Sequence, residues 1–347
     1  MCAFKSTPTR QRATREYEFV QRLGKGTFGK VYLANVKGEL KKMVAIKLCD
    51  ASTSERELFM LNTIKKSVIQ SKFVAGHSDS YVRGTKLFIV MEWMKMTLWE
   101  VIHKEEGKMS LHAIRVVSKQ ILLGLSALHS MGIIHNDLKP NNVMLVDHIK
   151  YPYQLKIIDF GGSVHPNFKG GAAENRPSQS YIAPESNINS IVSPKSDIWA
   201  HACIVLEMIF TKRFFRAQSP METTYQHVQL MGNPSLKFWK MMKNRFMAHF
   251  KFNRGMAPIF NDKEKTKARK DSQPETFEAI HKHLLAEGRN EKDVECLNEL
   301  LKRMLTWNPK DRISVDDALE IDFLNPERFE DKQYAEEAKE YFKKSKL

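Results

Sequence analysis

The sequence has little cysteine and no long apolar segment, and both features limit the classes to which it can belong. The four cysteines lie far apart, without a Cys-x-x-Cys pair, at Cys2, Cys49, Cys203 and Cys296. We therefore expect reduced thiols in an intracellular protein, cytoplasmic or nuclear, without a zinc site. The N-terminal residues lack the apolar segment of a signal peptide. The longest apolar stretch, 198–210, contains His201 and Glu207 and is too short to cross a bilayer, so no membrane contact is expected.

The charge is strongly basic, with 55 Lys and Arg against 40 Asp and Glu and a formal net charge of +15. Such a balance is compatible with a nucleic-acid ligand. However, the basic residues are spread along the chain, and no basic stripe is interleaved with aromatic residues. We therefore expect solvated basic faces rather than direct nucleic-acid binding. A denser basic run at 263–270 has almost no apolar neighbours and is predicted to be an exposed loop, with a nuclear-import signal as the alternative.

The first part of the chain is rich in strand patterns. Residues 1–16 are polar, basic and aperiodic, which predicts a flexible tail. Between Tyr17 and Met91 lie the β-runs FVQRLG, KVYLANV, MVAIKL and KLFIVMEW, together with a helix candidate at 54–66. Past Thr97 the pattern becomes helical. A strand-rich half followed by a helix-rich half predicts an α+β fold with two lobes.

Two helices of the second half are well marked. Apolar residues recur at steps of three and four between Leu111 and Leu128, with Ser110 as N-cap and Gly132 at the end. A second helix starts near Ser193 and is apolar on all sides, so it should be buried. The region 211–298 indicates helices separated by polar loops. The last segment, 326–347, is amphipathic and is expected to dock on the large lobe, with a partner-binding helix as the alternative.

A glycine-rich loop lies between the first two β-runs. Gly24, Gly26 and Gly29 form GKGTFG, and glycines allow backbone N–H groups to approach a phosphate. In a dinucleotide fold such a loop would lead into a helix, whereas KVYLANV follows here. Lys47 comes next in VAIK. On its own, this lysine is compatible with an outward-facing strand position.

Two further strings carry polar groups suited to nucleotide chemistry. HNDLKPNN spans residues 135–142 and contains Asp137 and Asn142, and DFG at 159–161 contributes Asp159. Carboxylate and amide oxygens are the ligands that hard cations such as Mg²⁺ prefer. In this order and spacing, after the glycine loop and VAIK, these strings resemble the signature set of eukaryotic protein kinases. The resemblance covers about residues 17–325.

The resemblance implies a bilobal protein-kinase-like fold, with a small β-rich N-lobe at 17–91, a hinge at 92–96 and a helical C-lobe at 97–325. It also implies the roles of the catalytic residues. Asp137 would be the base and Lys139 would place positive charge near the γ-phosphoryl group. Lys47 would hold the α- and β-phosphates, and Ser178 would bridge Asp137 and Lys139. Asn142 and Asp159 would bind Mg²⁺.

Glu57 is the expected partner of Lys47, because it lies on the same side of the predicted helix as the apolar residues Leu61, Ile64 and Val68. Glu55 is the alternative, and Glu57 could instead form a capping box with Ser54. The residues that the resemblance places around ATP are Leu23, Gly24, Lys25, Gly26, Thr27, Phe28, Gly29, Val31, Ala45, Lys47, Glu57, Glu92, Met94 and Met144.

The segment from Asp159 to the APE residues, 183–185, carries the regulatory expectations. The lower half resembles the group that contains cyclin-dependent and MAP kinases, but Ile182 replaces the arginine of that group, which puts proline-directed specificity in doubt. Asn136 replaces the arginine that normally receives an activating phosphate. We therefore predict that switching does not depend on phosphorylation within 160–182. Asp197 is expected to brace the catalytic loop, and Arg312 to pair with Glu185.

The function implied by the resemblance is ATP- and Mg²⁺-dependent transfer of the γ-phosphoryl group to Ser/Thr hydroxyls of protein substrates, with a regulatory partner as a further possibility. A pseudokinase scaffold that binds ATP without transfer is the first alternative. A basic nucleic-acid-associated protein and a kinase acting on a small molecule are the others.

Overall fold

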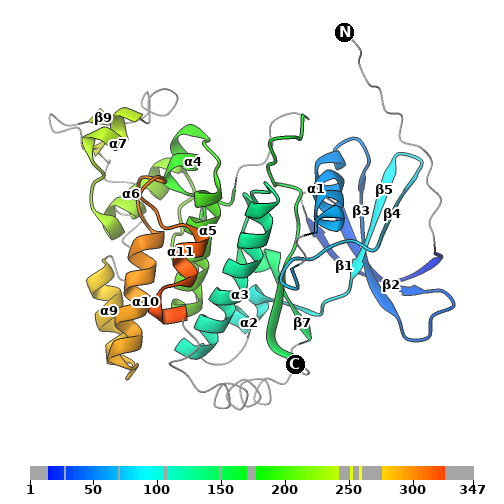
Figure 1. Ribbon diagram of the computed structural model, residues 1–347, viewed down its shortest axis with the longest axis horizontal. Helices are drawn as coiled ribbons and strands as arrows, with labels where there is room; N and C mark the ends of the chain where they lie inside the picture. The colour runs from blue at the N-terminus through cyan, green and yellow to red at the C-terminus, as the bar shows by residue number, and fades with distance from the viewer. Residues whose placement is uncertain are drawn as a thin grey trace, which may run out of the picture.

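The computed structural model describes residues 15–26, 29–68, 71–104, 108–147, 151–169, 177–241, 251–252, 258–259 and 276–324. A small lobe built on a sheet lies beside a larger helical lobe, as Figure 1 shows. The α+β two-lobe architecture expected from the sequence is confirmed. Residues 1–14, the basic run at 263–270 and the segment 326–347 lie outside the described residues, as do Thr27 and Phe28.

The small lobe contains a five-stranded antiparallel sheet with the strand order β1-β2-β3-β5-β4. Its strands are β1 (Tyr17–Gly26), β2 (Gly29–Val36), β3 (Met43–Asp50), β4 (Asp79–Arg83) and β5 (Lys86–Glu92). Four of them match the predicted β-runs. Strand β4, with the sequence DSYVR, was not predicted, because it is a short edge strand without a continuous apolar pattern.

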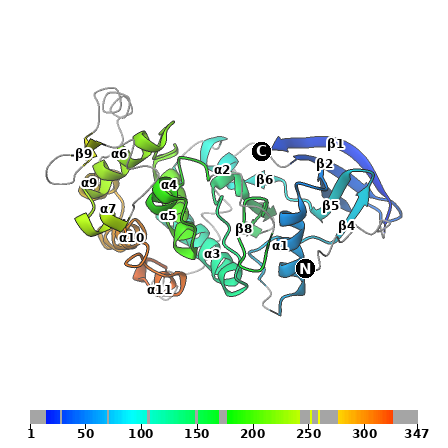
Figure 2. The same ribbon diagram turned by 90° about the horizontal axis from the view of Figure 1, so that it is seen from above.

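Helix α1 (Glu55–Lys66) covers the side of the sheet that faces the large lobe, as the view from above in Figure 2 shows. Its buried face is formed by residues three or four positions apart, namely Glu57, Met60, Leu61 and Ile64. A carboxylate thus shares the buried face of α1 with apolar side chains, and it must find a partner inside the protein.

The large lobe begins with a three-stranded sheet of order β6-β7-β8. These strands are β6 (Met96–Thr97), β7 (Val143–Asp147) and β8 (Tyr151–Ile157), and a 3₁₀ turn at Pro140–Asn142 leads into β7. The helices are α2 (Leu98–Lys104), α3 (Leu111–Ser130), α4 (Pro184–Asn189), α5 (Pro194–Phe210), α6 (Pro220–Met231), α7 (Leu236–Met241), α9 (Phe277–Ala286), α10 (Glu291–Met304) and α11 (Val315–Leu319). A two-stranded pair, β9 (Lys251–Phe252) with β10 (Pro258–Ile259), and a 3₁₀ turn at Asp322–Leu324 complete the described elements.

Helix α3 forms the centre of this lobe and follows its predicted bounds. The Ser110 side chain accepts a hydrogen bond from the backbone N–H of Ala113, and Gly132 follows the helix with a φ of 76°. Among the described residues, α3 is the helix with the length and hydropathy to cross a membrane, and 67% of its apolar window is buried. It packs against β8, α5 and α11, so its apolar sides are covered by the lobe itself.

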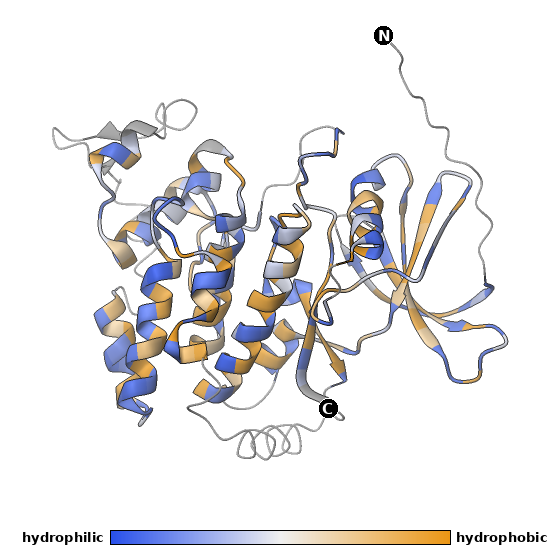
Figure 3. Cartoon of the chain, in the orientation of Figure 1, coloured by the Kyte–Doolittle hydropathy of each residue, from blue (hydrophilic) through white to orange (hydrophobic). Residues whose placement is uncertain are grey.

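Helix α5 is buried on all sides, as its composition predicted. Every residue from Ser196 to Phe210 is buried, and at the start of the helix the backbone N–H of Ser193 donates to the side-chain oxygen of Ser196 at 3.3 Å. Helices α9 and α10 differ from it: Figure 3 shows hydrophilic and hydrophobic residues mixed along both of them. They therefore have one apolar side turned to the core and one polar side turned to solvent.

Candidate active site at the junction of the two lobes

Lys47 connects the small lobe to the large lobe through two carboxylates. Its Nζ lies 2.7 Å from Oε1 of Glu57 on α1 and 2.8 Å from Oδ1 of Asp159 after β8. Lys47 is 6% exposed and Glu57 is 2% exposed. Glu57, and not Glu55, is therefore the residue of α1 that reaches the lysine. The Ser54 side chain makes no capping hydrogen bond, so the alternative capping box does not form.

The protonation states at this site follow from burial and from the ion pairs. Burial lowers the pKa of Lys47, but the two carboxylates more than offset this and raise it above its usual value. Burial raises the pKa of Asp159, but the Lys47 ammonium more than offsets this and lowers it. The pKa of Glu57 is raised, mainly by burial. A cationic lysine and an ionised aspartate thus stand side by side in a water-poor location.

The catalytic-loop residues 135–142 form a second polar cluster. Nζ of Lys139 lies 2.6 Å from Oδ2 of Asp137. The side-chain nitrogen of Asn142 donates to the carbonyl oxygen of Asp137 at 2.8 Å and to its Oδ2 at 3.3 Å. The backbone N–H of Ile158 donates to the carbonyl oxygen of Asn142 at 2.9 Å, so Asn142 lies next to the strand end that carries Asp159.

Asn142 and Asp159 were the predicted Mg²⁺ ligands, and their chemistry fits a hard cation. The amide nitrogen of Asn142 is turned to Asp137, and within the described part of the chain its amide oxygen accepts no hydrogen bond. Asp159 supplies an ionised carboxylate. Two oxygen ligands beside a bound polyphosphate are the kind of site in which Mg²⁺ is held.

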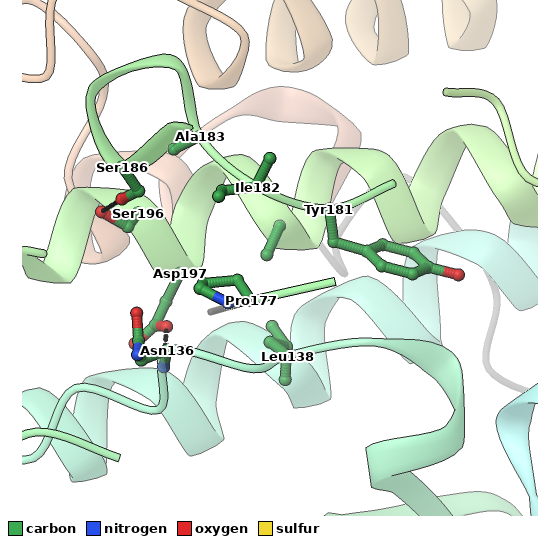
Figure 4. Close-up of a pocket in the computed structure, with 10 residues that line it drawn as sticks. Asn136, Leu138, Pro177, Tyr181, Ile182, Ala183, Ser186, Ser196 and Asp197 are labelled. Carbon is green, nitrogen blue, oxygen red and sulfur yellow. Dashed lines mark hydrogen bonds between the residues drawn. The ribbon is translucent and has the colours of Figure 1, made fainter. Parts of the chain in front are cut away.

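Asp197 at the start of α5 braces the catalytic loop, as expected. Its carboxylate accepts hydrogen bonds from the backbone N–H groups of His135 and Asn136, each at 2.9 Å, and lies 2.9 Å from Nε2 of His129. Figure 4 shows Asn136 and Asp197 next to each other, with Pro177 beside them. The loop is therefore held by one buried carboxylate at the start of α5.

Phe160 of the DFG string is buried beside His135, with the ring centroids 5.6 Å apart. It belongs to the same apolar core as Leu61 of α1. The contact places an apolar side chain between α1 and the catalytic loop, directly after Asp159.

The glycines of the phosphate loop differ in their surroundings. A Cβ on Gly29 would lie 2.4 Å from the carbonyl oxygen of Leu48, and its φ is 147°, so this position requires glycine for packing against β3. A Cβ on Gly24 or Gly26 would meet nothing within 4 Å. These two glycines therefore leave the backbone open on the side where a phosphate could approach.

The other residues expected around ATP border the same region. Sheet register places Val31 opposite Lys47 and Ala45 opposite Met91. Met144 pairs with Thr97 at the start of the large lobe and is half-buried. Leu23 and Lys25 are exposed on β1, and Met94 is buried after β5. Glu92, at the end of β5, forms an ion pair with Lys156 of β8.

Ser178 lies in the segment above the catalytic loop and is half-buried. Its carbonyl oxygen accepts the backbone N–H of Tyr181 at 2.9 Å. In the described residues its hydroxyl makes no hydrogen bond to Asp137 or Lys139, which contact each other directly. The bridging role therefore remains a prediction for the substrate-bound protein. A small cavity lies beneath this segment, lined among others by Leu138, Ile182 and Asp197 (Figure 4).

One polar chain near the site was missed from the sequence. The Tyr181 hydroxyl donates to Oε2 of Glu207 on α5, and Oε1 of Glu207 lies 2.7 Å from Nε2 of His103 on α2. Glu207 is fully buried. Burial, followed by the charge of Glu207, raises the pKa of Tyr181. These residues come from segments far apart in the chain, and the glutamate within an apolar run was the signal that could have indicated a buried polar partner.

Known proteins share this architecture. The family model of the protein kinase domain matches residues 17–324 of this chain. The chain is 28% identical over 374 residues to homeodomain-interacting protein kinase 4 of Mus musculus, covering 97% of this chain and 59% of that protein. It is 27% identical over 342 residues to homeodomain-interacting protein kinase 1 of Caenorhabditis elegans, covering 89% of this chain and 40% of that protein.

The chain thus spans little more than half the length of the mouse relative. A crystal structure of a kinase domain matches with a TM-score of 0.71 and 20% identity, covering 92% of this chain and 98% of the other, and supports the fold. These relatives agree with the resemblance to the group that contains cyclin-dependent and MAP kinases. With its two lobes, the Lys47 ion pairs and a family match over residues 17–324, the chain belongs to the protein kinase family.

Proposed function

We propose that this protein transfers the γ-phosphoryl group of ATP to Ser/Thr hydroxyls of protein substrates. The observation that carries the proposal is the position of Lys47 between Glu57 and Asp159, at 2.7 and 2.8 Å. The buried ammonium lies on β3, which pairs with the strand that follows the glycine loop, and it contacts Asp159, a predicted Mg²⁺ ligand. This arrangement suits an anionic ligand that bridges both lobes.

The catalytic loop supplies the groups for the transfer step. The oxygen of the substrate hydroxyl forms a bond to the γ-phosphorus of ATP, and the bond from that phosphorus to the oxygen of the departing ADP breaks. During this step the carboxylate of Asp137 accepts the proton of the substrate hydroxyl. Lys139, already 2.6 Å from Asp137, places positive charge where the transferred group gains negative charge. Asn142 and Asp159 would hold Mg²⁺, which neutralises phosphate charge when bound.

In the proposed complex, ATP contacts Leu23, Gly24, Lys25, Gly26, Thr27, Phe28, Gly29, Val31, Ala45, Lys47, Glu57, Glu92, Met94 and Met144. The domain division is 17–91, 92–96 and 97–325, with tails on both sides. The substrates are proteins, and the location is inside the cell, in the cytoplasm or the nucleus. The curated relatives are named for interacting with homeodomain proteins, which favours a protein partner here as well.

A degenerate Ser/Thr peptide library incubated with Mg-ATP tests this function. We expect phosphorylated Ser and Thr, and no selection of proline at the +1 position, because the buried aliphatic Ile182 replaces an arginine there. An Asp137→Asn variant should lose roughly 10²- to 10⁴-fold in turnover and still bind ATP. Tight ATP binding without transfer in the unaltered protein would instead identify a pseudokinase scaffold.

A further inference from the structure

Helix α1 contacts the segment that follows DFG through residues without a part in the proposed catalytic step. Arg56 and Phe59 lie three positions apart on α1 and share one side of the helix. The Arg56 guanidinium lies 4.8 Å from the ring centroid of Phe168 and donates to the carbonyl oxygen of Ser163 at 3.3 Å. The Phe59 ring lies 5.3 Å from that of Phe168 and 5.4 Å from that of His165. We call Arg56, Phe59, His165 and Phe168 the α1 clamp.

The clamp is anchored to the large lobe at its other end. Nδ1 of His165 accepts a backbone hydrogen bond at 3.0 Å, so its Nε2 carries the proton and donates to the carbonyl oxygen of Met131 at 3.1 Å. Next to it, Val164 and Ile134 exchange backbone hydrogen bonds at 2.8 and 2.9 Å. The position of Phe168 is therefore set by the end of α3 and by the catalytic loop.

The clamp is also adjacent to the catalytic ion pair. Glu57 lies between Arg56 and Phe59 in the sequence of α1 and reaches Lys47 with Oε1 alone, and among the described residues its Oε2 has no hydrogen-bond partner. This single contact would be lost if the helix turned or moved outward. The Lys47–Glu57 pair consequently depends on whatever holds α1 in place.

We propose that Arg56 and Phe168 are positioning residues for the Lys47–Glu57 pair, and that the α1 clamp holds α1 in its active position without a phosphate on the activation segment. The inference rests on the proposed kinase function. The face of an aromatic ring attracts a guanidinium through its quadrupole, so the Phe168 ring gives Arg56 a contact on the activation segment that requires no phosphate. The clamp thereby connects α1 to the large lobe by contacts that are present in the unmodified chain.

Two further observations in the described segment agree with this role. The side-chain nitrogen of Asn136 donates to the carbonyl oxygen of Gly162 at 3.1 Å, so an uncharged group holds the segment at the position where the family usually has an arginine. Ser163 is fully buried, and its hydroxyl donates to the carbonyl oxygen of His135 at 3.2 Å. This hydroxyl is already used within the fold and is not accessible to another kinase.

The test compares phosphatase-treated variants of the full chain. Phe168→Ala and Arg56→Met should each lower kcat about tenfold by depopulating the active position of α1, while Phe168→Tyr, which keeps the ring, should stay within about twofold. Lys302→Ala is the matched control, since this lysine lies 5.9 Å from the Phe277 ring, in a cation–π contact remote from the site. Its kcat should be unchanged. Loss of activity on phosphatase treatment of the unaltered chain would overturn the inference.

A second readout does not depend on turnover. If the clamp maintains the pair, Phe168→Ala should free Lys47 from Glu57 and speed acylation of its buried amine by a small amine-reactive reagent, measured by mass spectrometry. In a Glu57→Gln background, Phe168→Ala should cause no further loss of kcat. Unchanged acylation, or fully additive losses, would refute the positioning role. If the unaltered chain transfers no phosphoryl group, the proposed function fails, and acylation still reports on the clamp.

Discussion

Arg312 and Glu185 form a bidentate ion pair in which both side chains are fully buried. The Nη1–Oε1 and Nη2–Oε2 distances are 2.7 and 2.9 Å. The pair joins the segment before α11 to the start of α4, and the Arg312 guanidinium also lies 5.1 Å from the ring centroid of Trp199. Its position confirms the pairing expected from the sequence.

Breaking this pair from one side should destabilise the protein strongly. Arg312→Met leaves the Glu185 carboxylate buried without its cation, which we expect to lower the free energy of unfolding by about 3–5 kcal/mol in urea denaturation. Arg303→Met is the control, because its pair with Glu299 is exposed and spans 3.4 Å. That variant should lose less than about 1 kcal/mol. Equal effects of the two substitutions would contradict the architectural role.

Substitutions in the glycine loop should have two different effects, because one glycine is needed for folding and the other two for ATP binding. Gly29→Ala forces a Cβ to within 2.4 Å of the Leu48 carbonyl oxygen, so we expect a lower melting temperature. Gly24→Ala and Gly26→Ala meet no protein atom within 4 Å and should leave the melting temperature unchanged while raising KM for ATP. An unaltered KM for ATP in both of these variants would argue against the phosphate-binding assignment.

Glu57 and Glu55 should differ clearly in steady-state kinetics. Glu57→Gln removes the charge that holds Lys47 from the side of α1, and we expect kcat/KM for ATP to fall on the order of 10²-fold. Glu55 is exposed at the start of the same helix, so Glu55→Gln should behave as the unaltered protein. Identical kinetics of the two variants would show that the ion pair is not used in catalysis.

Stability should fall below neutral pH because of two buried histidines. Within the described residues, the ring nitrogens of His201 and His227 have no hydrogen-bond partner, and burial lowers the pKa of each to about 3, with Arg312 adding to the effect at His227. The unfolded chain binds these protons near pH 6.5 and the folded chain does not. Stability is therefore retained above pH 6.5 and lost as pH falls toward 3.

We expect each histidine to account for about 1.4 kcal/mol of lost unfolding free energy between pH 7.5 and 5.5. The ring centroid of His227 lies 4.6 Å from that of Trp199 and 4.7 Å from that of Phe215. His227→Phe keeps an aromatic ring there and should reduce the pH-dependent loss of unfolding free energy by about 1.4 kcal/mol. Guanidinium denaturation of both proteins at pH 7.5 and pH 5.5 measures this difference in unfolding free energy. A pH dependence equal to that of the unaltered chain would mean that His227 is hydrated or hydrogen-bonded.

Local patterns were sufficient for much of the architecture. The bounds of α3 follow from a regular apolar repeat with an N-cap serine and a terminal glycine, and the burial of α5 follows from its all-round apolar composition. The residues around Lys47 and Asp137 were predicted because short strings with the spacing of the kinase signature set resemble that family. In the structure these strings meet at the junction of the lobes.

Other features depend on contacts that no local window contains. Strand β6 has two residues and exists only because β7 pairs with it. The Tyr181–Glu207–His103 chain connects three segments, and the apolar run around Glu207 indicates a buried partner without indicating which residue it is. The α1 clamp likewise joins Arg56 to Phe168 across more than a hundred positions. Tertiary packing decides such contacts, so sequence periodicity could not indicate them.

The central position of α3 has a consequence for synthesis of the protein. Its covering elements, β8, α5 and α11, all follow it in the sequence, and α11 ends at Leu319. A growing chain therefore exposes a twenty-residue helix with the hydropathy of a membrane segment long before its neighbours exist. We expect the nascent chain to require chaperone protection until the end of the large lobe has left the ribosome, and chains that terminate before residue 315 to expose the side of α3 that α11 covers.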